Sequence, residues 1–279
     1  MNADDPLVIF SHGNSFPAGT YRVMLGELRR RGWRVKAVDK FGHDPRYPVT
    51  ANWPHLVQQL ADFAAAEQAR SGRPALLVGH SLGGFLSVMA AARHPELACG
   101  VLMIDSPLLG GWRAASVRVA RGTPIMETVL QSAVSRRRRN RWPGVNEAIE
   151  HLRHKKAFAS WDPQVLRDYV ERGMHEENGQ RVLSFDREVE SAIYDTIPVN
   201  LESLLRRHPL KCPAAFIGGL QSEELKRVGT ALTEKITRGR ITMVDGSHLF
   251  PMERPIAAAA TIDASLLNLL DAAQRQARG

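Results

Sequence analysis

Six short apolar segments alternate with longer helix-forming stretches along this chain of 279 residues. The apolar segments are residues 7–11, 34–39, 75–79, 100–105, 214–218 and 241–245. The helical stretches are residues 19–31, 54–71, 82–94, 222–238 and 255–275. Short, continuous apolar runs bounded by Gly, Pro and Asp are typical of parallel strands that are buried on both faces. The alternation therefore predicts an α/β fold, in which helices cover both faces of a six-stranded, mostly parallel sheet.

The alternation stops between residues 106 and 211. That stretch has helical patterns and one polar, hairpin-like piece near residues 178–185, where Asn178-Gly179 is a strong turn signal. We interpret it as a helical insertion between two strands of the sheet. Residues 1–106 and 207–279 are expected to form the core domain, and residues 107–206 the insertion.

The surplus of positive charge lies in this insertion. The whole chain has 37 Lys+Arg and 29 Asp+Glu, a net charge of +8. Residues 113–156 hold 11 basic and 3 acidic residues, which accounts for all of it (11 − 3 = +8). Four adjacent arginines lie in this segment, Arg136, Arg137, Arg138 and Arg139. They could form a solvated surface, attract an anionic substrate toward the site or contact an anionic membrane surface. Nucleic-acid binding is not expected, because no recognition fold accompanies the arginines.

Two cysteines, Cys99 and Cys212, are too few for a multi-bridge disulfide framework or a four-thiolate zinc site. No uninterrupted apolar run approaches the ~20 residues that span a bilayer. The acidic first residues are not typical of a signal peptide. We therefore expect a cytoplasmic protein in which both thiols are free and act as small buried side chains.

The string Gly79-His80-Ser81-Leu82-Gly83 matches G-x-S-x-G and lies between a predicted strand and a predicted helix. In that context the serine occupies a strained turn, and the small neighbours let the strand and the helix approach closely. The serine Oγ is then exposed above the sheet, and the N–H of Leu82 points at the reacting oxygen. The pattern predicts a nucleophilic Ser81; the alternative is an ordinary serine in a glycine-rich turn.

Two further loops carry candidate residues. His12-Gly13-Asn14 directly follows the first strand, where a loop supplies the second oxyanion donor, here the N–H of Asn14. The alternative for Asn14 is a left-handed turn residue. His248 lies in a glycine-containing loop after the last strand, where it can act as general base and then as general acid.

These three strings together resemble the α/β-hydrolase family, and the resemblance covers most of the chain. It implies a serine hydrolase with a helical cap, or lid, before the penultimate strand and a triad in the chain order Ser, acid, His. The family usually has two further strands before the first strand found here, but only residues 1–6 precede it. A sheet of six strands is therefore expected. Its strand order places residues 34–39 at a sheet edge, where Arg34 and Lys36 discourage pairing with another chain.

The acid of the triad departs from the family pattern. The family places an aspartate shortly after the penultimate strand, where this chain has Gln221 and Ser222. Asp105 ends an earlier strand, residues 100–105, which follows the helix after Ser81. It is the preferred candidate, because some branches of the family, including many haloalkane dehalogenases, carry the acid at the end of that earlier strand. Its alternative role is a turn-forming residue. Glu223 or Glu224 is the other candidate, although acidic residues also suit the first turn of a helix.

We therefore expect an esterase- or lipase-like hydrolase that acts on a carboxylic ester or thioester of a small, hydrophobic substrate. Ser81 would attack the carbonyl, His248 would transfer the proton, Asp105 would orient the imidazole, and the N–H groups of Asn14 and Leu82 would bind the oxyanion. No metal or organic cofactor is implied. Hydrolysis of a C–C bond or an amide and acyl transfer stay open, as does a non-catalytic binding protein with a degenerate triad.

Overall fold

The computed structural model describes residues 6–108 and 132–278. Its main sheet has six strands in the order β2-β1-β3-β4-β8-β9, and every pairing is parallel. The strands are β1 (Leu7–Ser11), β2 (Arg34–Ala37), β3 (Ala75–His80), β4 (Ala98–Ile104), β8 (Ala214–Gly219) and β9 (Ile241–Val244). The prediction of six parallel strands is confirmed, and so is the edge position of the second strand.

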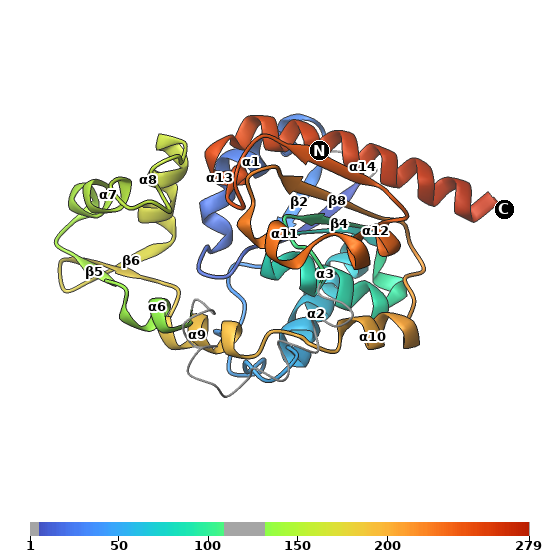
Figure 1. Ribbon diagram of the computed structural model, residues 1–279, viewed down its shortest axis with the longest axis horizontal. Helices are drawn as coiled ribbons and strands as arrows, with labels where there is room; N and C mark the ends of the chain where they lie inside the picture. Colours follow the sequence, from blue (N-terminus) through green and yellow to red (C-terminus); the bar gives the residue numbers. More distant parts are fainter. Residues whose placement is uncertain (1–5, 109–131, 279) are drawn as a thin grey trace.

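Helices cover both faces of this sheet (Figure 1). On one face lie α1 (Arg22–Arg30) and α14 (Pro255–Arg278), and on the other α2 (Pro54–Ser71) and α3 (Leu82–Arg93). Alternate strand residues divide between two cores, since Val8 packs with the α1 and α14 side and Ile9 with the α2 and α3 side. This division is what the two-residue period of a strand requires when both faces are covered.

The remaining elements of the body are short. They are the 3-10 helices η1 (Ala18–Tyr21) and η2 (Pro95–Leu97) and the helices α11 (Glu223–Val228), α12 (Ala231–Thr237) and α13 (Phe250–Glu253). The single helix expected over residues 222–238 is divided into α11 and α12, because Gly229 ends α11 with a φ of 78°. Cys99 and Cys212 are free, and burial raises their thiol pKa values to about 11 and about 12.

Helix α14 is long and apolar enough, by length and composition alone, to cross a membrane. In this fold it instead packs along β4, β8 and α1. Its buried side chains, Ala258, Ala259, Ile262, Leu266 and Leu269, belong to the core on that face of the sheet. The core therefore accounts for the buried apolar stripe of α14, while Ile256 and Leu267 are exposed.

The insertion between β4 and β8 forms a separate lobe, at the left of Figure 1. The elements of the lobe are α6 (Ser132–Arg137), β5 (Arg141–Trp142), α7 (Val145–Arg153), α8 (Pro163–Arg172), β6 (Met174–Glu177), β7 (Gln180–Leu183) and α9 (Arg187–Asp195). The last helix of the insertion, α10 (Leu201–Arg207), instead packs against α3 of the body. The predicted hairpin is β6–β7, and Asn178 and Gly179 form its turn with positive φ. The lobe is not purely helical, since β5 adds a third antiparallel strand. The boundaries 107–206 stay a prediction, and residues 109–131 lie outside the described part of the chain.

Part of the basic run is neutralised within the lobe. Arg136 pairs with Asp195 and Arg138 with Glu190, each at 2.6 Å. Arg139 lies over the ring of Trp142, 5.6 Å from its centre. Contact of this run with an anionic surface stays a prediction.

Candidate active site

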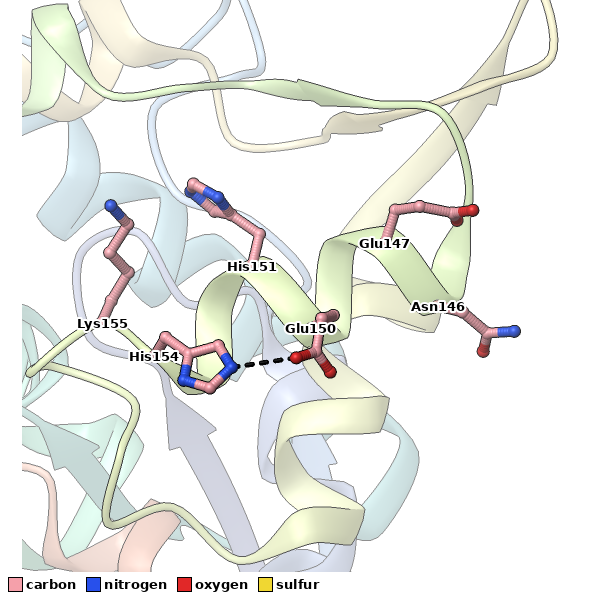
Figure 2. A pocket seen from close by; sticks show the side chains of 6 residues that line it. All are labelled: Asn146, Glu147, Glu150, His151, His154 and Lys155. Atoms are coloured by element: carbon pink, nitrogen blue, oxygen red, sulfur yellow. Dashed lines mark hydrogen bonds and ion pairs between the residues drawn. The ribbon is translucent and has the colours of Figure 1, made fainter.

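Among the described residues, titratable side chains gather at several places, and two of them are compared first. One is a hollow of about 650 Å³ on α7, shown in Figure 2 and lined by Asn146, Glu147, Glu150, His151, His154 and Lys155. It lies on the lobe, away from the six-stranded sheet (Figure 1), and its His154 is already bonded to Glu150 at 2.9 Å. The other place is the carboxyl end of the parallel strands, where ligands bind in open α/β sheets. The predicted catalytic residues all lie there.

Ser81 occupies the turn between β3 and α3 with φ 52° and ψ −117°, a conformation that is strained for any residue with a side chain. Glycines make the turn possible. A Cβ on Gly79 would lie 2.0 Å from the carbonyl of Gly83, and a Cβ on Gly83 would lie 2.0 Å from the carbonyl oxygen of Ser11. The close approach of β3, α3 and β1 therefore requires these glycines and leaves Ser81 partly exposed.

Two backbone N–H groups near Ser81 are available to bind an anion. Leu82 is the first residue of α3, so its N–H has no partner within the helix. Asn14 follows β1, and it is Ser15, not Asn14, that takes the left-handed conformation, with φ 76°. Within residues 6–108 and 132–278, neither the Asn14 N–H nor the Leu82 N–H has a hydrogen-bond acceptor.

The loop that carries Asn14 is fixed by His12, which is fully buried. The His12 Nδ1–H donates to the carbonyl of Gly13 (2.7 Å), and Nε2 accepts the N–H of Phe41 (3.1 Å). Burial lowers the pKa of His12 to about 4, so the ring is neutral at neutral pH.

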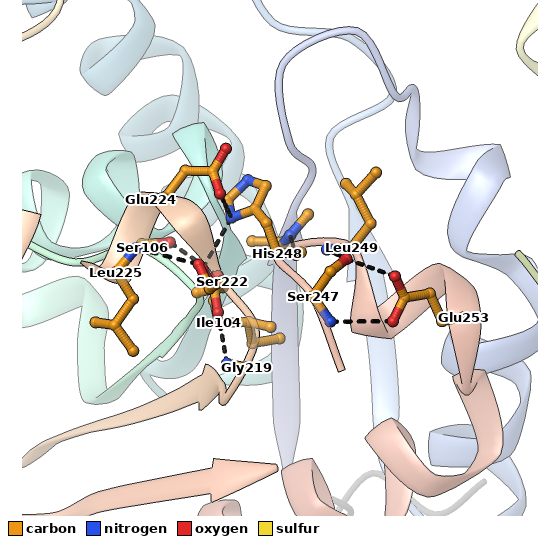
Figure 3. A network of polar contacts seen from close by, with 12 residues as sticks. Ile104, Ser106, Gly219, Ser222, Glu224, Leu225, Ser247, His248, Leu249 and Glu253 are labelled. Carbon is orange, nitrogen blue, oxygen red and sulfur yellow. Dashed lines mark hydrogen bonds and ion pairs between the residues drawn. The ribbon is translucent and has the colours of Figure 1, made fainter. Parts of the chain in front are cut away.

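Asp105 directly follows β4 and is fully buried, with φ 41°. Its carboxylate accepts three hydrogen bonds, from Nδ1 of His248 (2.8 Å), the N–H of Gly219 (2.6 Å) and the hydroxyl of Ser222 (2.6 Å). Figure 3 shows this network around the His248 ring. Burial alone would raise the pKa of Asp105, but the bond and charge of His248 and the other two donors hold it below the ordinary value.

The same contact acts on His248, whose side chain is 18% exposed. Burial disfavours the charged ring, but the bond to Asp105 and the charge of Glu224 outweigh it and raise the pKa of His248 above its ordinary value of 6.5. Because Nδ1 carries the proton directed at Asp105, the other ring nitrogen, Nε2, is left as the basic one.

The departure from the family pattern at residues 221–224 now has a structural explanation. Ser222 donates its hydroxyl to Asp105, and Gln221 donates its amide to Asp245 at 2.7 Å. The segment that usually supplies the acid here supplies a donor to it. Glu223 is 70% exposed and pairs with Lys226, whereas Glu224 Oε2 lies 3.8 Å from Nδ1 of His248.

His80 is a site residue that the sequence reasoning missed. Its Nδ1 lies 2.7 Å from the hydroxyl of Tyr21, which itself accepts the N–H of Gly13 (3.0 Å). The Tyr21 O–H therefore donates to Nδ1, and His80 Nε2–H donates to the carbonyl of His248 (2.9 Å). Burial lowers the pKa of His80 to about 3, which keeps this arrangement neutral. The only sequence signal was its place next to Ser81.

The Asn14 side chain is directed at the inserted lobe. Its Nδ2 donates to the carbonyl of Glu190 in α9 at 3.0 Å, and Glu190 in turn accepts the hydroxyl of Ser135 at 2.7 Å. Further bonds join the lobe to the body, among them those from Arg22 to Asp168 (2.9 Å) and from the Asp186 N–H to His43 (3.0 Å). The lobe is thus held directly against the loop that carries Asn14.

Three possible ligand atoms, from Asp105, Glu224 and His248, lie within 4.8 Å of one another. Their bonding suits proton transfer better than metal binding. Nδ1 of His248 carries a proton and has no lone pair for a metal, and Asp105 already accepts three hydrogen bonds.

Known proteins resemble this chain in sequence. Residues 8–262 match the family model described as "Alpha/beta hydrolase family". The chain is 28% identical over 278 residues to a protein of Mycobacterium phage D29 provisionally named a non-heme haloperoxidase, which covers 94% of this chain and 88% of the phage protein. It is 29% identical over 164 residues to the 2-(acetamidomethylene)succinate hydrolase of Mesorhizobium japonicum, which covers 56% of each chain.

Solved structures share the fold at lower identity. An E-2-(acetamidomethylene)succinate hydrolase superposes with a TM-score of 0.68 at 23% identity and covers 96% of this chain and 92% of its own. A thioesterase domain from the curacin biosynthetic pathway superposes with a TM-score of 0.69 at 18% identity, over 94% of this chain and 92% of its own.

Proposed function

The chain belongs to the alpha/beta hydrolase family, and from this premise we propose that it is a serine hydrolase that cleaves a carboxylic ester or thioester. Ser81 is the nucleophile, His248 the base and acid, and Asp105 the residue that orients the imidazole. The observation that carries the proposal is the 2.8 Å bond between Nδ1 of His248 and the buried, ionised Asp105. It fixes the tautomer in which Nε2 is free to accept a proton.

The reaction has two halves. The Ser81 hydroxyl gives its proton to Nε2 of His248 while Oγ attacks the carbonyl carbon, and the N–H groups of Asn14 and Leu82 bind the oxyanion. Collapse of the tetrahedral intermediate breaks the ester or thioester bond, and His248 returns the proton to the departing alcohol or thiol. Water then attacks the acyl-serine with His248 again as base, which releases the acid and regenerates Ser81.

Electrostatics favour this cycle. During each half His248 becomes an imidazolium, and the negative charge of Asp105 beside it stabilises that state. His80 holds the backbone of the His248 loop next to the turn that carries Ser81. Both contacts are in place before any substrate binds, so the transition state needs little reorganisation.

We further propose that the substrate is small and hydrophobic. Aromatic side chains of the lobe contact the loop that carries Asn14, since the ring centre of Phe16 in that loop lies 5.4 Å from that of Trp161 and 5.9 Å from that of Tyr169. Phe16, which is only partly buried, is the residue of this contact that a hydrophobic group attached to the reacting carbonyl would meet. No cofactor enters the proposal, and a cytoplasmic location remains part of it.

A panel of p-nitrophenyl esters of increasing acyl length tests the proposal. We expect turnover that depends on Ser81 and His248 and an optimum of kcat/KM at one acyl length, because the lobe limits the pocket. A folded protein that hydrolyses no member of the panel, and no thioester analogue, would favour the rival interpretation of a non-catalytic binding protein.

A further inference from the structure

A second carboxylate lies beside the ring of His248. Glu224 is in the first turn of α11, and its Oε2 is 3.8 Å from the same Nδ1 that bonds Asp105. Its side chain is 30% exposed, so it is partly withdrawn from water. Figure 3 shows the Glu224 and Ser222 side chains on the same side of the His248 ring.

The other ionisable groups around His248 come from four elements. Asp105 at the end of β4 is the only other described acidic group paired with the ring, at 2.8 Å. His80 at the end of β3 has its ring centre 5.0 Å away and is neutral. Tyr194 of α9 also lies within electrostatic range of Glu224, and Glu253 of α13 bonds the neighbouring Ser247. Glu224 is therefore a second negative charge at a ring that already has one acid partner.

We propose that Glu224 is a positioning residue of the active site, a second acid that attracts the Nδ1–H of His248 together with Asp105. The idea rests on the proposed function of His248 as the base. Asp105 makes the short bond, and Glu224 adds charge on the same side of the ring. Both favour the tautomer with the proton on Nδ1, and both stabilise the imidazolium that forms during each half of the reaction.

The neighbouring glutamate offers a matched control. Glu223 precedes Glu224 in the same helical turn and carries the same charge, but it is 70% exposed and bonded to Lys226 at 2.7 Å. Glu223→Gln and Glu224→Gln therefore remove the same charge from the same short helix. Only Glu224→Gln removes it from the surroundings of His248.

The first measurement is the titration of the His248 ring by NMR in the resting protein, which requires no turnover. A nearby carboxylate favours the charged ring, so its loss must lower the pKa of His248. We expect Glu224→Gln to lower it by roughly one pH unit, and Glu223→Gln to leave it nearly unchanged. No change with Glu224→Gln, or an equal change with both variants, would overturn the proposal. Because the readout is not activity, it stays informative even if the protein hydrolyses no ester.

The second measurement uses an Asp105→Asn background. If Glu224 shares the work of holding Nδ1–H, the residual ester turnover of Asp105→Asn should fall by about a further tenfold with Glu224→Gln and stay constant with Glu223→Gln. Circular dichroism establishes that each double variant is folded. An Asp105→Asn enzyme that is indifferent to Glu224→Gln would contradict the proposal.

Discussion

Replacement of Asp105 by Asn changes one atom of a buried carboxylate that receives three donors. Oδ2 accepts the N–H of Gly219, and Oδ1 accepts both the hydroxyl of Ser222 and Nδ1–H of His248. An asparagine can direct its carbonyl oxygen toward His248 only if its NH₂ group faces the N–H of Gly219, two donors at a separation of 2.6 Å. In the opposite orientation the oxygen accepts from Gly219, and the NH₂ group faces His248.

The second orientation fixes the wrong tautomer. An NH₂ group facing Nδ1 makes that nitrogen an acceptor, so the proton moves to Nε2 and His248 can no longer take the proton of Ser81. A buried N–H left without a partner costs about 1–3 kcal/mol, which favours this orientation by roughly five- to a hundred-and-sixtyfold. Together with the lost charge beside the imidazolium, the change should lower kcat/KM by about 10³- to 10⁴-fold.

The assay is hydrolysis of the best p-nitrophenyl ester from the panel, with the folded fraction checked by thermal unfolding. Asp62→Asn is the control, because it removes a carboxylate from the surface of α2. We expect the control to keep wild-type kcat/KM. If Asp105→Asn is folded and its kcat/KM lies within tenfold of the wild-type value, the assignment of Asp105 is refuted.

Three further predictions concern stability and substrate charge. Gly83→Ala should destabilise the protein by about 1–3 kcal/mol or more in urea unfolding, because its Cβ would lie 2.0 Å from the Ser11 carbonyl oxygen; unchanged stability would contradict the described turn. His12 and His80 have folded pKa values near 4 and 3 against an ordinary 6.5, so the unfolded state binds more protons as the pH falls. Each should therefore cost up to about 1.4 kcal/mol of stability per pH unit below 6.5, measured by unfolding at pH 6.5 to 4.5. If the basic lobe steers anionic substrates, kcat/KM for an anionic ester should fall as salt rises while a neutral ester is indifferent, and equal responses would exclude steering.

The body of the fold could be predicted because its signals are local. Continuous apolar runs such as residues 75–79 report burial on both faces of a sheet, and helix-forming stretches between them leave only parallel connections. The turn at Ser81 was equally readable, since Gly79 and Gly83 sit where a side chain has no space. Asp105 could be proposed because some branches of the family that the chain resembles carry the acid at the end of this strand.

Contacts between distant segments could not be read in this way. The bond from His80 to the His248 carbonyl spans 168 positions, and the bond from Asn14 to Glu190 spans 176. Neither residue type indicates such a partner. The third strand of the lobe is only Arg141–Trp142, too short to give an alternating pattern. The basic run looked uniform in the sequence, but the structure pairs Arg136 and Arg138 with acidic residues that follow far along the chain.

Reaction of the folded protein with a fluorophosphonate, followed by peptide mapping, tests the central claim most directly. The phosphonyl group mimics the tetrahedral intermediate and reacts with a serine only when a base and oxyanion donors activate it. We predict one label per chain, located on Ser81, which is absent in Ser81→Ala and strongly slowed in His248→Ala. A folded protein whose Ser81 stays unlabelled, or whose label lies on another residue, would contradict the account.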